Sequence, residues 1–386
     1  MQELMQADVR AVCGPRGRHD PDRVANRHGS EAGSVALGGR RVPITRPRVR
    51  AADGSGEVPV PAYELFSSTE IMGRMALERM LAGVSTRRYP VTLEPVGDLV
   101  QAEGTSTSRS AVSRKFVAMT EHALADLLAA DLSGLDLVAL MIDGVHFADH
   151  LCVVALGIDL DGSKHPLALV EGSTENTTLV RGLLVGLRDR GLDATRPILA
   201  VLDGAKALAA AVTEVFDHPV IGRCQLHKLR NVQDHLPEKM RRLVGRRMRD
   251  AYHADSALDA QAQLEALAAE LDKTHPGAAG SLREGLVETL IVLSLGLAPT
   301  LARTFRSTNA IESMIGICRH HARNVKRWRD GQMALRWCAA GMVEASRQFR
   351  RVNGHLHLPA LRSALERHVG VDTVSADCHD QNVSAA

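Results

Sequence analysis

Three apolar runs in quick succession constrain the fold of this chain most. They are the segments LVALMID, LCVVALGI and HPLALVE, which begin at Leu137, Leu151 and His165. Each has the length of a strand, and turn residues such as Asp161 and Gly162 separate them. Short apolar runs joined by tight turns predict three consecutive antiparallel strands.

The next segment alternates between helical and strand patterns. Leucines recur at helical spacing between 179 and 187, and the apolar run ILAVLD follows at 198–203. A helical pattern from Ala207 to Phe216 then precedes the short strand PVIG. The order βββαβαβ predicts an α/β fold with a ribonuclease H-like mixed sheet, in which the first and fourth strands are neighbours.

Three acidic residues occupy informative places in this pattern. Asp143 ends the first apolar run, Asp203 ends ILAVLD, and Glu312 lies in STNAIES at the start of a helical segment. Neighbouring strands would place both aspartates at one edge of the sheet. Two magnesium ions about 3.5–4 Å apart need carboxylates that converge from different elements. The alternative is local: such aspartates often form turns or helix caps, and such a glutamate often caps a helix.

The pattern divides the chain into regions. Residues 1–60 are rich in Arg, Gly, Pro and Asp, with weak periodicity, which predicts a basic, partly disordered arm. We expect a helical DNA-binding region at 61–130, the α/β catalytic domain at 135–236 and 303–350, an all-helical insertion at 237–302, and a C-terminal helix and tail at 351–386.

A helix-turn-helix is the hypothesis for the second region. A short helix from Gly97 to Ala102 meets a polar turn, and a second helix starts near Ser108. Its apolar residues would face inward, which leaves Arg109, Ser113 and Arg114 outside. Short polar and arginine side chains suit a DNA major groove. A surface helical hairpin would show the same pattern.

Bulk composition excludes little, but charge and cysteine placement are informative. The net charge of the 386 residues is only +2, yet the segment after Glu312 is locally basic. The six cysteines have no regular spacing, which favours reduced thiols. The longest apolar stretch, at 290–298, is too short to span a bilayer. We therefore expect a soluble cytoplasmic protein with no membrane partner. The residues expected to lie along a DNA backbone are Arg319, Arg323, Lys326 and Arg327.

Four motifs together carry a family resemblance. They are MIDGVHF around Asp143, VLDGAKAL around Asp203, RCQLHKLRNV from Arg223, and STNAIES around Glu312. From about Arg46 to about Arg362 the chain resembles bacterial insertion-sequence transposases of the Mutator family, which carry an Asp-Asp-Glu triad on a ribonuclease H-like domain.

The resemblance implies DNA cleavage at the terminal inverted repeats of an insertion sequence and strand transfer into target DNA. It implies that Asp143 bridges two magnesium ions, with Asp203 on one and Glu312 on the other; manganese would substitute for magnesium. It further implies a homo-oligomer on double-stranded DNA, associated with the bacterial nucleoid.

Cys224 and His227 lie one helical turn apart in the third motif. They are candidates for packing beside the acidic residues, for DNA contact, or for zinc, although zinc requires two further ligands. Two other functions remain open, namely a hydrolytic ribonuclease H-like nuclease and a DNA-binding regulator derived from a transposase. The helix-turn-helix and the insertion argue against the first, and the intact acidic triad argues against the second.

Overall fold

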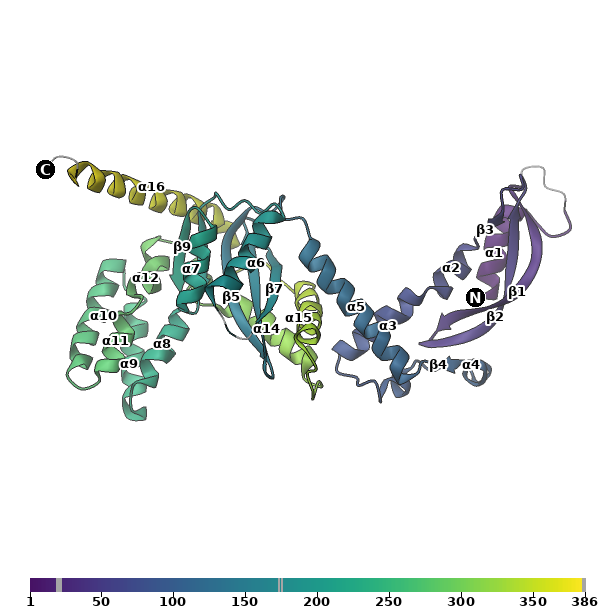
Figure 1. Cartoon of the computed structure of the whole chain (residues 1–386), viewed down its shortest axis with the longest axis horizontal. Helices are drawn as coiled ribbons and strands as arrows, with labels where there is room; N and C mark the ends of the chain where they lie inside the picture. Colours follow the sequence, from purple (N-terminus) through teal and green to yellow (C-terminus); the bar gives the residue numbers. More distant parts are fainter. Residues whose placement is uncertain (19–22, 173, 175, 384–386) are drawn as a thin grey trace. The chain divides into compact units, whose positions relative to one another are not determined.

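The computed structural model describes residues 1–18, 23–172, 174 and 176–383 (Figure 1). The chain forms two compact units, residues 1–122 and 123–386. Helix α5 (Arg109–Ala129) begins in the first unit and ends in the second. Each unit has its own sheet, and each is described separately below.

A long hairpin dominates the N-terminal unit. Strands β1 (Ala25–Leu37) and β2 (Arg40–Ala51) pair antiparallel, and the connection is Gly38 and Gly39. Both glycines have positive φ, 55° and 78°, as a tight two-residue hairpin turn requires. Two short strands, β3 (Glu57–Val58) and β4 (Thr105–Ser106), also pair with β2.

Helix α1 (Gln2–Cys13) packs its apolar side into a core with this sheet. Met5, Val9 and Cys13 recur every four residues and are buried, together with Val49 of β2. The prediction of a partly disordered arm at residues 1–60 is therefore wrong. The strand signal is weak because much of the hairpin is accessible to solvent, so glycine and arginine interrupt the apolar alternation.

The remainder of the N-terminal unit is mainly helical. A second, small hydrophobic core of this unit contains Val112 of α5, Ala76 and Tyr89. Arg109, Ser113 and Arg114 of α5 are exposed. The segment between α4 and α5 is not a simple polar turn, because it contains β4. The other elements are α2 (Pro61–Ser67), α3 (Thr69–Leu81), the 3-10 helix η1 (Tyr89–Thr92) and α4 (Asp98–Glu103).

A five-stranded mixed sheet forms the centre of the C-terminal unit, in the order β7-β6-β5-β8-β9. The three long strands pair antiparallel, whereas β8 runs parallel to β5 and β9 parallel to β8. The predicted neighbours, the first and fourth strands of this sheet, are thus paired. The strands are β5 (Leu137–Phe147), β6 (His150–Asp159), β7 (Lys164–Gly172), β8 (Ile198–Leu202) and β9 (Pro219–Arg223).

Helices cover both faces of this sheet (Figure 1). On one face, α6 (Thr177–Asp189) and α7 (Lys206–Val215) bury their leucines and valines against β5, β6 and β8. On the other face, α14 (Asn309–Ala322) and α15 (Gly331–Ser346) pack on β5, β6 and β7. A sheet buried on both faces explains why its strands are nearly continuous apolar runs.

A group of helices separates β9 from α14. The helices α8 (Gln225–Asp234), α9 (Glu238–Ala251), α10 (Ala257–Asp272), α11 (Pro276–Arg283) and α12 (Leu286–Ser294) share one core. Helix α13 (Pro299–Phe305) follows and leads to α14. The segment 237–302 thus contains helices and loops in the structure, and its core extends back into α8.

The C-terminal helix α16 (Leu358–Val383) returns to the sheet after the 3-10 helix η2 (His355–His357). Arg362 donates hydrogen bonds to the carbonyls of Pro197 and Leu137, at 2.6 and 2.8 Å. This contact lies at the N-terminal ends of β5 and β8, whereas Asp143 and Asp203 lie toward their C-terminal ends. Residues 384–386 of the predicted tail lie outside the described part. No helix in the described segments combines the length and hydrophobicity needed to cross a membrane.

Candidate active site

The sheet register places the two aspartates side by side. The last residue pair between the parallel strands β5 and β8 is Met141 with Val201. Asp143 and Asp203 each lie two residues beyond this pair, so they lie at the same level of the sheet. Strand β5 continues to Phe147 because β6 still pairs with it there. The prediction that the aspartates share one sheet edge is consistent with this register.

Each aspartate is fixed by a short backbone hydrogen bond. The Gly144 N–H donates to Asp143 Oδ1 at 2.7 Å, and the Ala205 N–H donates to Asp203 Oδ1 at 2.9 Å. Both carboxylates remain partly accessible. Asp203 therefore stabilises a turn through one carboxylate oxygen, as the alternative interpretation expects. The second oxygen of each aspartate can still accept a bond from another partner.

Glu312 lies in the first turn of α14 and approaches from a different element. The buried Thr308 precedes this helix and its hydroxyl donates to Glu312 Oε1 at 2.6 Å. The backbone of the preceding segment is tied to α8, because the Gln225 N–H donates to the Arg306 carbonyl at 2.9 Å. These contacts give the glutamate a fixed direction on a rigid helix end.

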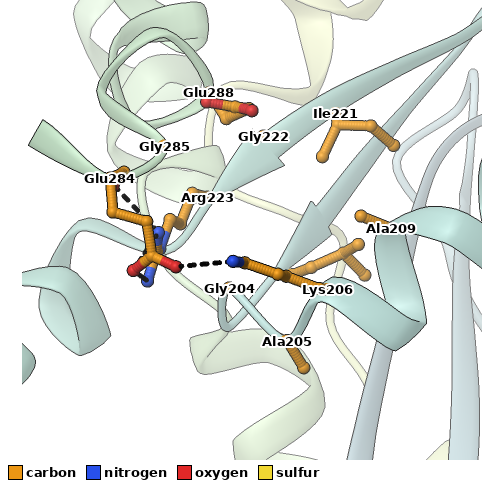
Figure 2. A pocket seen from close by; sticks show the side chains of 11 residues that line it. Gly204, Ala205, Lys206, Ala209, Ile221, Gly222, Arg223, Glu284, Gly285 and Glu288 are labelled. Atoms are coloured by element: carbon orange, nitrogen blue, oxygen red, sulfur yellow. Dashed lines mark hydrogen bonds and ion pairs between the residues drawn. The ribbon is translucent and has the colours of Figure 1, made fainter. Parts of the chain in front are cut away.

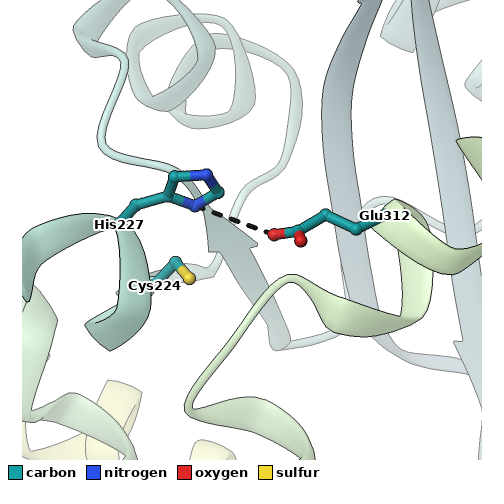
Figure 3. Close-up of side chains that lie close together, drawn as sticks. All are labelled: Cys224, His227 and Glu312. Carbon is teal, nitrogen blue, oxygen red and sulfur yellow. Dashed lines mark ion pairs between the residues drawn. The ribbon is translucent and has the colours of Figure 1, made fainter. Parts of the chain in front are cut away.

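Cys224 and His227 meet Glu312 at this junction (Figure 3). The Cys224 N–H donates to the Leu202 carbonyl at 2.7 Å, which holds the start of α8 next to the end of β8. His227 Nδ1 is 3.8 Å from Glu312 Oε1, and Figure 3 shows the imidazole and the carboxylate facing each other. Both sequence candidates therefore lie beside the acidic residues.

Thr308 occupies the centre of this small cluster. Its hydroxyl oxygen lies 3.5 Å from Cys224 Sγ and 3.4 Å from His227 Nδ1, in addition to its bond to Glu312. The ligand atoms of Cys224, His227 and Glu312 lie within 4.8 Å of one another, which a metal ion would also require. A structural zinc site has four ligands, but this cluster offers three, and Thr308 already bonds to them. Packing therefore explains the arrangement of Cys224, His227 and Glu312 better than a zinc ion does.

The charges of these residues influence one another. The pKa of Asp143 is raised to about 6. Burial is the largest cause and the negative charges of Asp203 and Glu312 act in the same direction, whereas the Gly144 N–H and His227 lower the pKa. Burial is the main cause, so the raised pKa marks a carboxyl group that is partly removed from solvent and lies near two other acidic residues. Carboxylate oxygens are ligands that hard divalent ions prefer.

Cys224 and His227 stabilise each other electrostatically. A hydrogen bond to Cys224, together with the charges of Glu312 and Asp203, raises the pKa of His227. Burial raises the pKa of the Cys224 thiol, but hydrogen bonds with His227 and Thr308 outweigh it and leave that pKa lowered. A positively charged imidazole beside Glu312 offsets part of the negative charge at the site.

The helical group is attached to the sheet next to this site. Figure 2 shows Glu284 reaching Arg223 and Lys206, with ion pairs of 3.4 and 3.6 Å, around a cavity of about 130 Å³. The fully buried Lys228 of α8 donates to the carbonyls of Ser281 and Glu284 at the end of α11. These polar contacts hold α8 and α11 together where the chain leaves the sheet.

The basic residues predicted to contact a DNA backbone follow Glu312 along the chain. They are exposed in the structure, on α14 and the loop after it; they are Arg319, Arg323, Lys326 and Arg327. Trp328 in this loop packs against Phe147 and Trp337, with ring centroids 4.8 and 6.4 Å apart. Arg109, Ser113 and Arg114 belong to α5 in the other unit.

Comparison with known proteins identifies the family. The profile described as "Transposase, Mutator family" matches residues 1–352. The chain belongs to the Mutator family of transposases. This result confirms the resemblance inferred from the four motifs, and it extends the match to the N-terminal residues.

Curated relatives of this Mutator-family chain are also named as transposases. It is 25% identical over 366 residues to the transposase for insertion sequence element ISRM5 of Rhizobium meliloti, covering 94% of this chain and 89% of that protein. It is 29% identical over 287 residues to the transposase for element IS6120 of Mycolicibacterium smegmatis, covering 73% and 86%. A transposase for element IS256 of Staphylococcus aureus is 28% identical, over 50% of this chain and 48% of that protein.

The sequence reading of this family member missed Thr308. Its signal was present, because Thr308 stands four residues before Glu312 in the STNAIES motif. One helical turn brings such residues together. The contacts with Cys224 and His227 depend on how α8 packs against α14, which the residue spacing does not reveal.

Proposed function

We propose that this protein is an Asp-Asp-Glu transposase with a ribonuclease H-like catalytic domain. It binds the terminal inverted repeats of its insertion sequence, cuts DNA there and joins the cut strand to target DNA. Family membership supports the transposase activity. The mixed sheet, in the order β7-β6-β5-β8-β9 with helices on both faces, supports the fold assignment.

The observation that carries the proposal is the strand register that sets Asp143 and Asp203 at one level of paired strands. Asp203 and Glu312 also lie close enough for their charges to raise the pKa of Asp143, beside the larger effect of burial. Asp143, Asp203 and Glu312 would hold two magnesium ions, with Asp143 common to both, Asp203 on one and Glu312 on the other, and manganese would substitute for magnesium. Metal bound there would supply the activation of an attacking water or 3′-hydroxyl oxygen and the stabilisation of the leaving oxygen.

The protein's own side chains prepare this chemistry. Thr308 and His227 hold Glu312 in one orientation, and backbone N–H groups hold Asp143 and Asp203. Metal ligands need a narrow geometric tolerance, which favours side chains that are held by such contacts. His227, whose pKa is raised by its hydrogen bond to Cys224 and by nearby charges, lies next to the place where the scissile phosphate binds.

Two surfaces bind DNA in this proposal. Arg109, Ser113 and Arg114 on α5 read bases of the terminal repeats in the major groove. The basic residues after Glu312, defined above, hold phosphates of the strand that reacts. Because an element has two ends that must be cut together, the protein acts as a homo-oligomer on DNA.

The test uses the full chain and a duplex that carries the inverted repeat flanking its gene. Asp143→Ala, Asp203→Ala and Glu312→Ala should each abolish cleavage and strand transfer in magnesium or manganese, and leave specific binding largely intact. Asp149→Ala is the matched control, since Asp149 is exposed on the turn of the same hairpin. Near-normal strand transfer by any one of the three variants removes that residue from the site.

The same assay separates the other functions. Cleavage without strand transfer would indicate a hydrolytic nuclease. Specific binding of the wild-type protein without cleavage would indicate a regulator derived from a transposase.

A further inference from the structure

A second pocket lies next to the acidic site, on the side of the helical group. It has a volume of about 330 Å³ and lies between α8, α9 and the segment that joins α13 to α14. This volume is at the lower end of pockets that hold small molecules, about 300–1,000 Å³. It is too small for a DNA duplex, whose groove contacts cover whole protein surfaces.

The charge of the pocket is entirely positive. Arg249, Arg303 and Arg306 line it, and none of its lining residues is acidic. In contrast, the cavity beside Lys206 and Arg223 also contains Glu284 and Glu288, so its charges cancel. Uncompensated arginines in a concave site favour an anion.

The walls of the pocket also contain apolar surface. Leu226 of α8 is 40% exposed, and Leu229 lines the pocket next to it. A pocket for free phosphate would not need this apolar surface. Apolar side chains combined with arginines match a nucleotide, which offers a flat base and a charged phosphate.

Two polar groups in the wall have no hydrogen-bond partner among the described residues. They are the hydroxyl of Tyr252, a residue only 3% exposed, and Nε of Arg306. An unpaired buried polar group costs about 1–3 kcal/mol and calls for an explanation. A ligand with acceptor atoms would supply the missing partners after a small adjustment of these side chains.

The pocket borders the cluster of Thr308, Cys224 and His227 beside Glu312. Gln225 of the wall follows Cys224, and Asn309 of the wall follows Thr308. The hydrogen bond from the Gln225 N–H to the Arg306 carbonyl joins these two segments. A ligand in the pocket therefore lies next to the place where a DNA strand reaches Glu312.

We propose that this pocket takes one unpaired nucleotide of the reacting DNA strand, adjacent to the scissile phosphate. The base lies against Leu226 and Leu229, and its phosphate is held by Arg249 and Arg303. Extruding a base from a duplex costs a few kcal/mol, which contacts in a fitted pocket offset. The proposal rests on the proposed function, because it assigns a subsite for the DNA of that reaction.

The test uses 2-aminopurine, a base whose fluorescence increases when it leaves the stack. It is placed in turn at each position near the cleavage site in the terminal-repeat duplex, and the full chain is added with calcium in place of magnesium. Fluorescence anisotropy of an end label on the same duplex reports binding. We expect a several-fold increase in emission at one position only.

Substitutions then locate the base. Leu226→Asp should abolish the increase in emission, whereas Leu243→Asp should preserve it, because Leu243 is an exposed leucine of α9 outside the pocket. Arg303→Ala should weaken binding to a duplex already unpaired at that position by roughly tenfold, the loss expected for one base or phosphate contact. Arg246→Ala, an exposed arginine of α9 outside the pocket, is the charge-matched control.

Each outcome decides one question. If DNA is bound and cut while 2-aminopurine stays quenched at every position, the pocket proposal is wrong and the proposed function stands. If Leu226→Asp and Leu243→Asp give the same emission, the base lies elsewhere. If Arg303→Ala weakens paired and unpaired duplexes equally, the pocket is only a phosphate contact. Failure to bind or cut the terminal repeat at all contradicts the proposed function itself.

Discussion

In the N-terminal sheet, Arg48 on β2 pairs with Glu57 on β3 at 2.9 Å, and both side chains are partly exposed. In the C-terminal sheet, Asp143 is partly buried near two further carboxylates, and its pKa is raised to about 6. The first arrangement neutralises charge in water, where an ion pair contributes little to stability. The second keeps negative charges together at a cost in stability, as expected where they hold cations.

In the proposed function, α5 of the N-terminal unit reads the DNA sequence and the carboxylates of the C-terminal unit carry the chemistry. Substitutions in the N-terminal unit should change which DNA is bound and leave the reacting groups intact. Substitutions near Asp143 should change metal binding, catalysis and the pH dependence of stability. Four predictions follow, in order of decreasing expected effect.

The largest effect concerns DNA recognition by α5. Arg109→Ala with Arg114→Ala should weaken binding to the terminal repeat, by about 1–3 kcal/mol for each bidentate contact with guanine that is lost. Binding to random duplex should change less. Arg87→Ala with Arg88→Ala removes two exposed arginines of the same unit and is the control. Equal losses for both duplexes would mean that α5 contacts only phosphates.

The second prediction concerns the stability of the metal-free protein. Since the folded-state pKa of Asp143 is raised from 3.8 to about 6, the folded protein binds more protons than the unfolded chain in this range. Stability from this group is present below about pH 4 and is lost as pH rises through 6. Asp143→Asn should therefore stabilise the protein at pH 8 by on the order of 2 kcal/mol.

Urea unfolding at pH 4 and pH 8 checks this prediction. The difference between Asp143→Asn and the wild-type protein should disappear at the lower pH. Magnesium should stabilise the wild-type protein more than the variant at pH 8, because only the carboxylate is a good ligand. A variant that is equally stable at pH 8 would show that the charges near Asp143 are compensated.

Thr308 provides a third, smaller effect. Thr308→Val removes the buried hydroxyl that donates to Glu312, and should cost about 1–2 kcal/mol of unfolding free energy because a hydrogen bond to a charged group is lost. Strand transfer should fall, and Thr308→Ser should restore it. If serine and valine behave alike, the hydroxyl does not position Glu312.

The smallest effect is expected in the N-terminal sheet. Arg48→Ala breaks the pair with Glu57, yet the midpoint of thermal unfolding should hardly change, because solvent replaces the lost contact. Circular dichroism at low and high salt measures this. A large, salt-dependent loss would contradict the contrast between the two sheets.

The same contrast explains what the sequence predicts well. Strands buried on both faces, such as LVALMID and ILAVLD, are continuous apolar runs, so the strand order and the pairing of β5 with β8 follow from the sequence. Asp143 and Asp203 then lie at one level of the sheet, because each ends such a run. Strands β1 and β2 have many solvent-exposed positions, so they contain no continuous apolar run. A search for apolar runs therefore predicts an arm where the structure has a hairpin.

Other features of the site depend on packing between distant segments. Thr308 meets His227 only because α8 and α14 begin side by side. Tyr252 and Arg306 reach one pocket from helices far apart in the chain. Spacing along the sequence contains no information on such contacts, since the length of the helical group between β9 and α14 does not determine its arrangement.

Manganese located in crystals tests the central claim most directly. The full chain is crystallised with its terminal-repeat duplex and soaked in Mn²⁺, and anomalous scattering locates the ions. The account predicts two peaks about 4 Å apart, both in contact with Asp143, one with Asp203 and one with Glu312. A single peak between Cys224 and His227, or no peak at the three carboxylates, would contradict it.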